Sequence, residues 1–514
     1  MKNGRLANSV KNAISGLVSR FLIIVLGLFV RSVFIFSLGN DYLGINGLYT
    51  NILSMLSLAE LGFGTAMVFS MYKPIAYNDQ EKLASLLKLY KKVYLIVGFV
   101  VLALGIGIIP FMDFIIKDPP NVEGLTFYYL LFLLNSVISY WFFAYRRSVL
   151  TADQKEYICT NYHNICQIVK SIFQIVFLLL FHNYLWFLIF QILFTIIENI
   201  AISIYAKKHY EAFSIKNPPS ISKEESHNLW GNVKALMASR LGHIILNSTD
   251  NIIISGLIGV AWVGLLSNFT LIVDSVTGVI CVITAAFSAS LGNYFIKENK
   301  ENSFKLFNRV EFMNSWLYGI SAILLFELLN PFVSVWIGEE YILSYWIIAA
   351  LVLNFFVQGY MNTLWTFRST LGLFQQGWFR PIIVSSVNIA LSIILGIYWG
   401  VFGVLIATTL SRASVNLWYD PWIIHKYGFN KPVKPFFKTY FFRLLEIILI
   451  ILVIELIKLL LANISISIVY FLVLSGVSIV ASAFFFWIFS HNKDEYKYFK
   501  NIVLGLPIFL RMKK

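Results

Sequence analysis

The chain has 514 residues, of which 58% are hydrophobic and only 13% are charged, whereas soluble proteins are about 45–50% apolar and about 25% charged. An ordinary soluble fold is excluded, because a globular interior could not hide that much apolar surface. The net charge of +14 does not indicate nucleic-acid binding, because the basic residues lie in short stretches between apolar runs, where they set membrane orientation and attract anionic lipid.

Apolar runs of about 18 residues or more recur along the chain, and each is a candidate transmembrane helix. The strands of a β-barrel are excluded, because the runs are too long and lack alternation with a period of two. We therefore predict an all-α polytopic membrane protein with about 14 transmembrane helices. The predicted spans are residues 10–38, 43–71, 89–110, 125–146, 160–181, 184–205, 231–257, 263–289, 309–336, 344–367, 379–399, 401–423, 444–462 and 467–489. Very short turns, such as Asn40 to Tyr42 and Gly400, are expected between neighbouring spans.

Lys and Arg side chains gather in every second connection between the predicted spans. The basic connections lie near residues 73–92, 146–155, 207–223, 297–309, 368–380 and 426–443, and both termini are also basic. The other connections contain essentially Lys117 alone. Because excess Lys and Arg mark the cytoplasmic side, we predict cytoplasmic termini and an even number of spans. No cleavable signal peptide is expected, because the first apolar run contains Arg20 and Arg31 and lacks a small-residue cleavage site.

An internal repeat appears when the first eighty-odd residues are shifted by about 220 positions. The matched pairs include Arg20 and Arg240, Gly39 and Gly259, and Gly44 and Gly264. Six spans precede the second copy, so both copies have the same orientation and predict two parallel six-helix lobes with a pathway between them. The predicted organisation is an N-terminal lobe at 1–208, a cytoplasmic linker at 209–230, a C-terminal lobe at 231–425, a cytoplasmic loop at 426–443, and a helix pair with a cytoplasmic tail at 444–514.

Charged side chains lie within several predicted spans, although each costs roughly 2.5–3.5 kcal/mol there and needs a partner or a watery cavity. Arg20 and Arg31 are eleven residues apart, almost three helical turns, and therefore lie on one face of the first span. The seventh span carries a polar stripe formed by Arg240, His243, Asn247 and Asp250. The other candidates within spans are Glu60, Asp274, Lys170 and Arg412.

These side chains allow a structural and a functional interpretation. In the structural one, Arg20 pairs with Glu60 and Arg240 pairs with Asp274, so that the pairs join neighbouring helices. In the functional one, they line an aqueous cavity where arginines bind an anionic headgroup such as a diphosphate through their planar fork of donors. The stripe on the seventh span, with its partial counterpart on the first, favours the functional interpretation.

No catalytic, cofactor or metal site is predicted. No Walker loop, His/Cys metal constellation or Ser-His-Asp arrangement can be assembled, and the three cysteines suit neither a zinc site nor a disulfide framework. Glu198 and Glu446 lie near span ends, and Glu455 and Lys458, one helical turn apart, are expected to pair with each other. We therefore expect a protein that is not an enzyme, and coupling to a proton gradient, a sodium gradient or the membrane potential stays open.

Several stretches resemble polysaccharide-unit flippases of the Wzx type, in the multidrug/oligosaccharidyl-lipid/polysaccharide (MOP) exporter superfamily. The most specific begins at Arg31 and reads RSVFIFSLGNDYLGINGLYTNILSMLSLAELGFGTAMVFSMYKPIAYNDQEKL. Further similar stretches are TADQKEY at Thr151, STDNIIISGLIGVAWVGLLSNF at Ser248 and SASLGNYF at Ser288. Together they extend the resemblance over most of the chain.

The resemblance implies fourteen helices, in two six-helix lobes plus a final pair, that work by alternating access. It also implies that an undecaprenyl-diphosphate-linked oligosaccharide moves from the inner to the outer leaflet of a bacterial cytoplasmic membrane. Family members use basic and acidic side chains that face the cavity, and Arg20, Arg31, Arg240, Asp250 and Asp274 fit that description. The implied partners are the lipid-linked oligosaccharide, membrane lipids, a polysaccharide polymerase and glycosyltransferases.

Other functions stay open at this point. A lipid II or teichoic-acid precursor flippase would share the fold. A membrane glycosyltransferase or polymerase would need a sizeable external loop, and the longest predicted one, around Lys117 to Gly124, is short. An exporter of cationic drugs would need an acidic or aromatic site, whereas the charges within the spans are mainly basic. A structural scaffold would not explain isolated charges at membrane depth.

Overall fold

In the computed structural model, every described element of secondary structure is helical. The structure describes residues 2–56, 63–117, 122–221, 225, 230, 233, 248–297, 300–373, 376–377, 379–461 and 467–501. Among these, nine helices are long and apolar enough to cross a membrane, and a tenth span results if the bent pair Leu125–Trp141 and Ala144–Ala152 counts as one. The prediction of an all-α, multi-pass membrane protein is therefore confirmed, and the total of fourteen spans and the cytoplasmic termini stay predictions.

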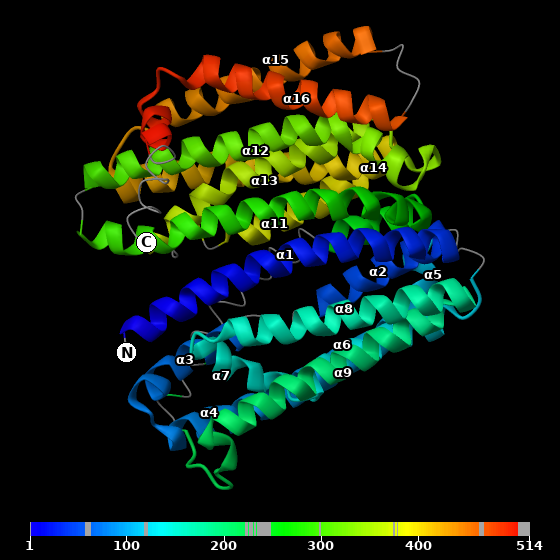
Figure 1. Ribbon diagram of the computed structural model, residues 1–514, viewed down its shortest axis with the longest axis vertical. Helices are drawn as coiled ribbons and strands as arrows, with labels where there is room; N and C mark the ends of the chain where they lie inside the picture. Colours follow the sequence, from blue (N-terminus) through cyan, green and yellow to red (C-terminus); the bar gives the residue numbers. More distant parts are fainter. Residues whose placement is uncertain are drawn as a thin grey trace. The chain divides into compact units, whose positions relative to one another are not determined.

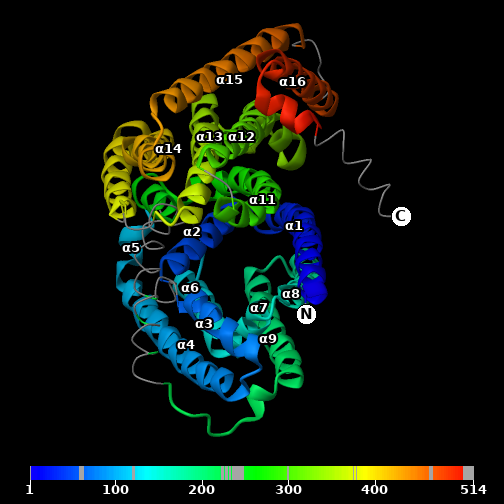
Figure 2. The same ribbon diagram turned by 90° about the vertical axis from the view of Figure 1, so that its left-hand side faces the viewer.

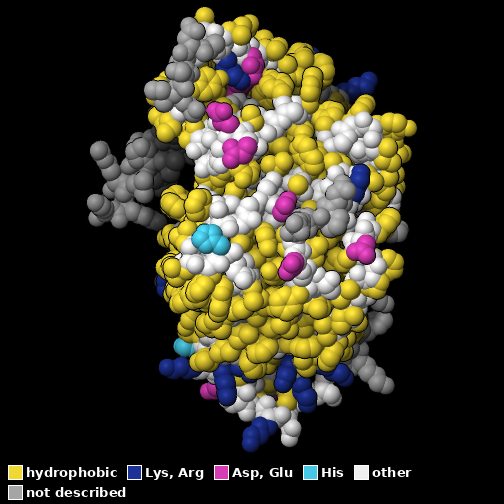
Figure 3. Space-filling view, turned by 90° about the vertical axis from the view of Figure 1, so that its right-hand side faces the viewer, with side chains coloured by type: hydrophobic (Ala, Val, Ile, Leu, Met, Phe, Trp, Pro, Cys, Tyr) yellow, Lys and Arg dark blue, Asp and Glu magenta, His cyan; other side chains and the backbone are white. Residues whose placement is uncertain are grey.

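Large hydrophobic side chains are exposed on the outside of the protein, as expected for helices that face lipid. Phe36 is 79% exposed, Phe114 is 85% exposed and Leu460 is 81% exposed. Figure 3 shows one face on which hydrophobic side chains predominate, with scattered Asp and Glu side chains and with Lys and Arg gathered at its lower edge. An aqueous environment would penalise this apolar surface, whereas a bilayer solvates it.

The contacts divide the chain into two compact units, residues Met1–Asn268 with Pro381–Val404 and residues Phe269–Arg380 with Leu405–Lys514. The first unit contains α1 (Lys2–Leu38), α2 (Asn40–Leu56), α3 (Phe63–Tyr77), α4 (Gln80–Ile108), α5 (Met112–Ile115), α6 (Leu125–Trp141), α7 (Arg147–Ala152), α8 (Glu156–Phe181) and α9 (Tyr184–His209). Within this unit α8 lies between α1 and α9, and α6 packs against both α4 and α9 (Figure 1).

The second unit contains most of α11 (Val260–Lys297), together with α12 (Lys300–Ile337), α13 (Tyr345–Thr370), the second half of α14 (Arg380–Ile423), α15 (Lys434–Leu461) and α16 (Ser467–Ser490). Helix α12 is its central element, because it packs against α13, α15 and α16 (Figure 2). Its polar and charged side chains therefore have neighbours on several sides.

One predicted span is interrupted. The span predicted at 125–146 contains α6, which ends at Trp141, and the following Phe143 adopts a left-handed conformation with φ of 60°. Apolar periodicity does not reveal this break, because the flanking residues stay apolar. The span predicted at 43–71 is described as α2 and α3, and its residues 57–62 lie outside the described part of the chain.

Glycines with positive φ lie at two short connections. Gly39, with φ of 80°, separates α1 from α2. The turn predicted at Asn40 to Tyr42 is wrong, because these residues form the first turn of α2. Gly400 has φ of 60° and ψ of −140°, and it divides α14 into two halves, so the predicted turn at Gly400 is confirmed. Positive φ values favour glycine, which has no Cβ to clash.

The repeat-related glycines Gly44 and Gly264 lie where α2 and α11 approach each other. A Cβ added to Gly264 would lie 2.7 Å from the Asn40 carbonyl oxygen, and a Cβ on Gly44 would overlap the Val260 carbonyl oxygen. Small residues permit such close packing of helix backbones in a membrane. The two glycines matched by the repeat thus perform matching roles in one helix contact.

Candidate functional site

Arg20 is half-buried on α1, next to a row of hydrogen bonds that joins α1 to α8. Ser15 Oγ donates to Asn161 Oδ1 at 2.7 Å, and Ser19 Oγ donates to Asn164 Oδ1 at 2.6 Å. These α8 amides were not among the predicted site residues, although their spacing of three residues places both on the α1 side of α8. They fix the face of α1 from which Arg20 extends.

Arg31, the second arginine of α1, contacts α11. Its Nη1 donates to Ser267 Oγ at 2.9 Å, and its Nη2 donates to the Ser267 carbonyl oxygen at 3.3 Å. Neither acceptor carries a formal charge, so these contacts do not neutralise the guanidinium. An anionic group would therefore be a stronger partner for Arg31 than the serine.

Lys170 lies on α8 near a polar pair between α8 and α9. His163 Nδ1 lies 3.0 Å from Glu198 Oε2. His163 and Lys170 are seven residues apart and share one face of α8. Glu198, which was expected near a span end, lies within α9 and contacts His163 of the neighbouring helix α8.

Asp250 is half-buried in the helical stretch 248–257, and Asp274 is exposed on α11. The neighbouring Thr249 contacts Asn388 of α14, with 3.3 Å between Thr249 Oγ1 and Asn388 Oδ1. The two aspartates belong to different units. Asp250 lies in the first unit and Asp274 lies in the second, on different helices.

Four candidates, Glu60, Arg240, His243 and Asn247, lie outside the described residues. The alternative pairs of Arg20 with Glu60 and of Arg240 with Asp274 therefore stay hypotheses.

Arg412 is buried in the second unit. It lies on α14 and forms hydrogen bonds to α13. Its Nη1 donates to Asn354 Oδ1 and, at 3.1 Å, to Gln358 Oε1, both on α13. Asn354 and Gln358 are four residues apart and thus lie on one face of α13. The geometry connects α13 to the second half of α14 by hydrogen bonds that a charged donor strengthens.

Asp420 is fully buried and contacts two arginines that were expected only as basic loop residues. Arg380 Nη1 contacts Asp420 Oδ1, and Arg368 Nη1 lies 3.4 Å from the same oxygen. Both arginine side chains are themselves almost completely buried. The available signal was Asp420, a carboxylate within the predicted span 401–423. The two arginines gave no signal, because loop charges are more often solvated than paired.

The predicted pair of Glu455 and Lys458 is confirmed, with 2.8 Å between Oε1 and Nζ. Lys458 Nζ also lies 3.0 Å from Oε2 of Glu327 on α12, and Glu327 is fully buried. Glu327 was not among the predicted site residues, although a carboxylate within an apolar run was the available signal. Glu446 forms a pair of the same spacing with Arg443 at 2.6 Å.

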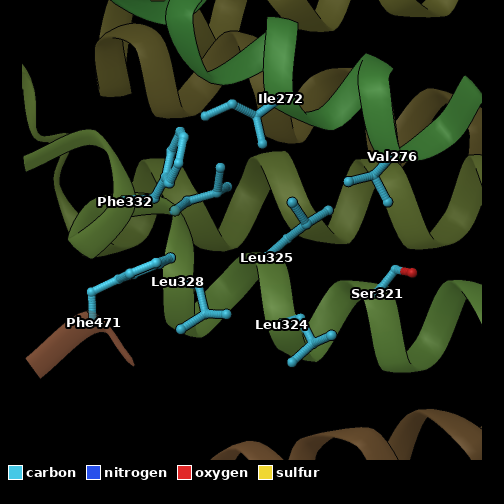
Figure 4. A pocket seen from close by; sticks show the side chains of 9 residues that line it. Ile272, Val276, Ser321, Leu324, Leu325, Leu328, Phe332 and Phe471 are labelled. Atoms are coloured by element: carbon cyan, nitrogen blue, oxygen red, sulfur yellow. The ribbon is translucent and has the colours of Figure 1, made fainter. Parts of the chain in front are cut away.

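An apolar cavity of about 240 Å³ lies within the second unit. Helix α11 contributes Ile272 and Val276, α12 contributes a leucine-rich face that includes Leu325, and α16 contributes Phe471 (Figure 4). Ser321 provides the polar atom among the labelled side chains, and it lies at one side of the cavity. A lining of this kind suits a hydrocarbon chain better than a sugar or an ion.

A metal centre is not found in the part of the chain that the structure describes, where no group of three or more His, Cys, Asp or Glu side chains could hold an ion. The intramembrane groups named above can form ion pairs, bind anions or exchange protons.

The architecture is similar to that of solved membrane transporters. A structure described as lipid II flippase MurJ, in an inward closed conformation, matches with a TM-score of 0.64 and 18% identity, covering 93% of this chain and 99% of that one. An inward-facing multidrug resistance MATE family transporter of the MOP superfamily matches with a TM-score of 0.59 and 15% identity, covering 79% and 97% of the two chains.

A third match is a MOP superfamily transporter from Pyrococcus furiosus, whose description states that a reverse polarity of its binding pocket suggests a different function. Its TM-score is 0.52 at 14% identity, and the match covers 81% of this chain and 96% of that one. No protein-family model and no curated protein matches the chain. At these identities the likeness concerns the fold: this is a multi-pass membrane protein with the architecture of MOP superfamily transporters.

Proposed function

We propose that the chain is a flippase of the Wzx type, which moves an undecaprenyl-diphosphate-linked oligosaccharide from the inner to the outer leaflet of a bacterial cytoplasmic membrane by alternating access. The observation that carries this proposal is the placement of Arg31 within the apolar helix α1 of a MOP-type fold. There, among the residues that the structure describes, its guanidinium donates only to the neutral oxygens of Ser267. A fixed cation with neutral neighbours suits a diphosphate that arrives with the cargo.

Two further features support an amphipathic, anionic cargo. Arg20 lies eleven residues before Arg31 on the same face of α1, so that the two guanidinium groups lie one after the other along that face. The apolar cavity of the second unit offers a surface for a segment of polyprenyl chain. In the first unit the proposed cargo-binding residues are Arg20, Arg31, Lys170 and Asp250. Asp274 of the second unit and the candidates outside the described residues stay predictions from the sequence.

The proposal also includes the partners and the energy source. Glycosyltransferases would build the cargo on the inner leaflet, and a polymerase would use it on the outer leaflet. A proton gradient, a sodium gradient or the membrane potential would supply the energy. Deleting the gene should therefore stop surface polysaccharide and leave lipid-linked repeat units facing the cytoplasm. Normal surface polymer in a clean deletion, with no second flippase present, would refute the proposal.

Arg31→Ala and Ser267→Ala form a matched pair that separates cargo binding from helix packing. If Arg31 binds the cargo, R31A should abolish export at a normal membrane level of protein, whereas S267A should keep most of the activity, because Ser267 contributes only neutral acceptors. If Arg31 mainly joins α1 to α11, both changes should lower the protein level and neither should stop export by the protein that remains. That second result would contradict the assignment.

Arg20 and Arg240 provide an independent test, since the repeat places them at matching positions. We expect R20A and R240A to be inactive but stable, and R20K to be partly active because lysine keeps the charge but lacks the planar fork. A low protein level that recovers when Glu60 or Asp274 is neutralised would instead support the structural interpretation.

A lipid II flippase is the second candidate, because the MurJ structure matches this chain over more of its length than the MATE structures do. Complementation decides between the two. A lipid II flippase should restore growth when the resident lipid II flippase of a bacterial host is depleted. A repeat-unit flippase should restore surface polysaccharide in a mutant that lacks its own flippase, and it should not rescue growth.

A further inference from the structure

A cluster of three charged side chains joins α12 to α15 within the second unit. Lys458 Nζ on α15 lies 3.0 Å from Glu327 Oε2 on α12 and 2.8 Å from Glu455 Oε1 on its own helix. Tyr345, the first residue of α13, donates from its hydroxyl to Glu455 Oε1 at 3.3 Å. The cluster therefore lies where three helices of this unit meet.

The two carboxylates of this cluster share one ammonium group. If all three groups were ionised, the cluster would carry a net charge of −1 inside the apolar part of the unit. Burying an uncompensated charge is expensive, and the usual response of such a group is to bind a proton. An ion pair that only joins two helices needs one carboxylate for one ammonium group. The presence of a second carboxylate on Lys458 therefore requires another explanation.

The burial of the two acids indicates which of them binds the proton. The Glu327 side chain is 0% exposed, whereas Glu455 is 30% exposed and accepts a second hydrogen bond from Tyr345. Glu327 Oε1 is buried and has no hydrogen-bond donor among the residues that the structure describes. Protonation is most favourable at a buried carboxylate oxygen that has no hydrogen-bond donor, which here is Glu327 Oε1.

The other titratable groups near this cluster are few. Helix α16, which also packs against α12, contributes Tyr470 as its titratable side chain, and the connection after α12 contributes the exposed Glu339 and Glu340 together with Tyr341. Glu311 lies on α12 itself but sixteen residues away, about 24 Å along the helix axis. None of these groups supplies a second cation that could neutralise Glu327.

We propose that Glu327, Lys458 and Glu455 form a proton-binding site, in which Glu327 takes up one proton from solution and becomes a neutral carboxylic acid. Protonation removes the attraction between Glu327 and Lys458, so that Lys458 remains paired with Glu455 alone and α15 is held less firmly to α12. Loss of the proton restores the bridge between the helices. Any role of this switch in transport rests on the proposed flippase function, whereas proton binding does not.

Infrared difference spectroscopy of the purified protein in lipid vesicles tests the site directly, because a protonated carboxyl group absorbs apart from a carboxylate. Wild type should show a carboxyl band that titrates with pH and that Glu327→Gln lacks. Glu455→Gln should lower the midpoint of the Glu327 band by about one to three pH units, because it removes a neighbouring negative charge. Lys458→Met should raise the midpoint of the Glu327 band, because it removes a neighbouring positive charge.

Glu446→Gln is the matched control, because Glu446 lies on the same helix and pairs one to one with Arg443. It should leave the Glu327 band unchanged. Because Glu455 is partly exposed, E455Q is expected to fold even if E327Q does not, and its midpoint shift tests the proposal without altering Glu327. An unchanged midpoint in both E455Q and K458M would overturn the proposal, as would a band that responds to sodium at constant pH.

An export assay at several external pH values separates this proposal from the proposed function. If both hold, E327Q should export cargo with less pH dependence than wild type. If the protein does not move lipid-linked oligosaccharide at all, the export assay fails in every variant while the infrared titration still gives its result.

Discussion

Replacing Asp420 with alanine should destabilise the second unit by about 3–5 kcal/mol, the usual cost of removing one partner from a buried ion pair. Asp420 is fully buried and its Oδ1 contacts both Arg380 and Arg368. D420A would leave two guanidinium groups in an apolar environment without their shared anion. The free-energy cost should lie near the lower end of that range, because Arg368 also donates to the Leu373 carbonyl oxygen at 2.8 Å.

The conservative variant D420N should be less damaging than D420A. An amide keeps the shape and one oxygen acceptor but loses the charge, so its cost should be about 1.5–3 kcal/mol, the contribution of a hydrogen bond to a charged group. The order wild type, D420N, D420A therefore tests whether charge and hydrogen bonding both contribute.

Thermal unfolding followed by fluorescence-detected size-exclusion chromatography in detergent measures the effect. For a unit of this size D420A should lower the midpoint by on the order of 5–10 °C. Asp494→Ala is the matched control, because Asp494 is almost completely exposed, and its 3.8 Å contact with Lys497 is a surface pair. A midpoint for D420A that equals that of wild type and D494A would refute the reasoning.

Three further predictions concern packing, buried polar contacts and topology. Gly44→Ala should lower the thermal midpoint, because its Cβ would overlap the Val260 carbonyl oxygen. In the control Gly16→Ala the new Cβ meets nothing within 4 Å, so this change should be neutral or slightly stabilising. Equal midpoints for the two variants would contradict this packing. Arg412→Met should cost about 1.5–3 kcal/mol through its lost hydrogen bonds, seen as a lower midpoint, and an unchanged midpoint would show that they contribute nothing. A cysteine at Lys216 should react with a membrane-impermeant label only after cells are opened, and strong labelling of intact cells would overturn the predicted orientation.

The partners of the charged residues could be predicted from sequence only where they lie close together in the chain. Glu455 and Lys458 are three residues apart, and the helical repeat alone brings them within reach, so that prediction is confirmed. Glu327 is separated from Lys458 by 131 positions, and no local pattern connects them. The partner of Arg31 could not be predicted for the same reason, because Ser267 is 236 positions away in the chain.

Membrane residence and helical structure were determined by the sequence, because a bilayer requires long apolar segments and requires each segment to satisfy its own backbone hydrogen bonds. The repeat likewise identified Gly44 and Gly264 before their packing against neighbouring backbone was visible. The tertiary structure decided which basic residues are solvated and which are buried, and it placed Arg368 and Arg380 against Asp420. The physical reason is that the bilayer acts on each helix separately, whereas ion pairs between helices depend on which faces meet, and that is a property of the whole fold.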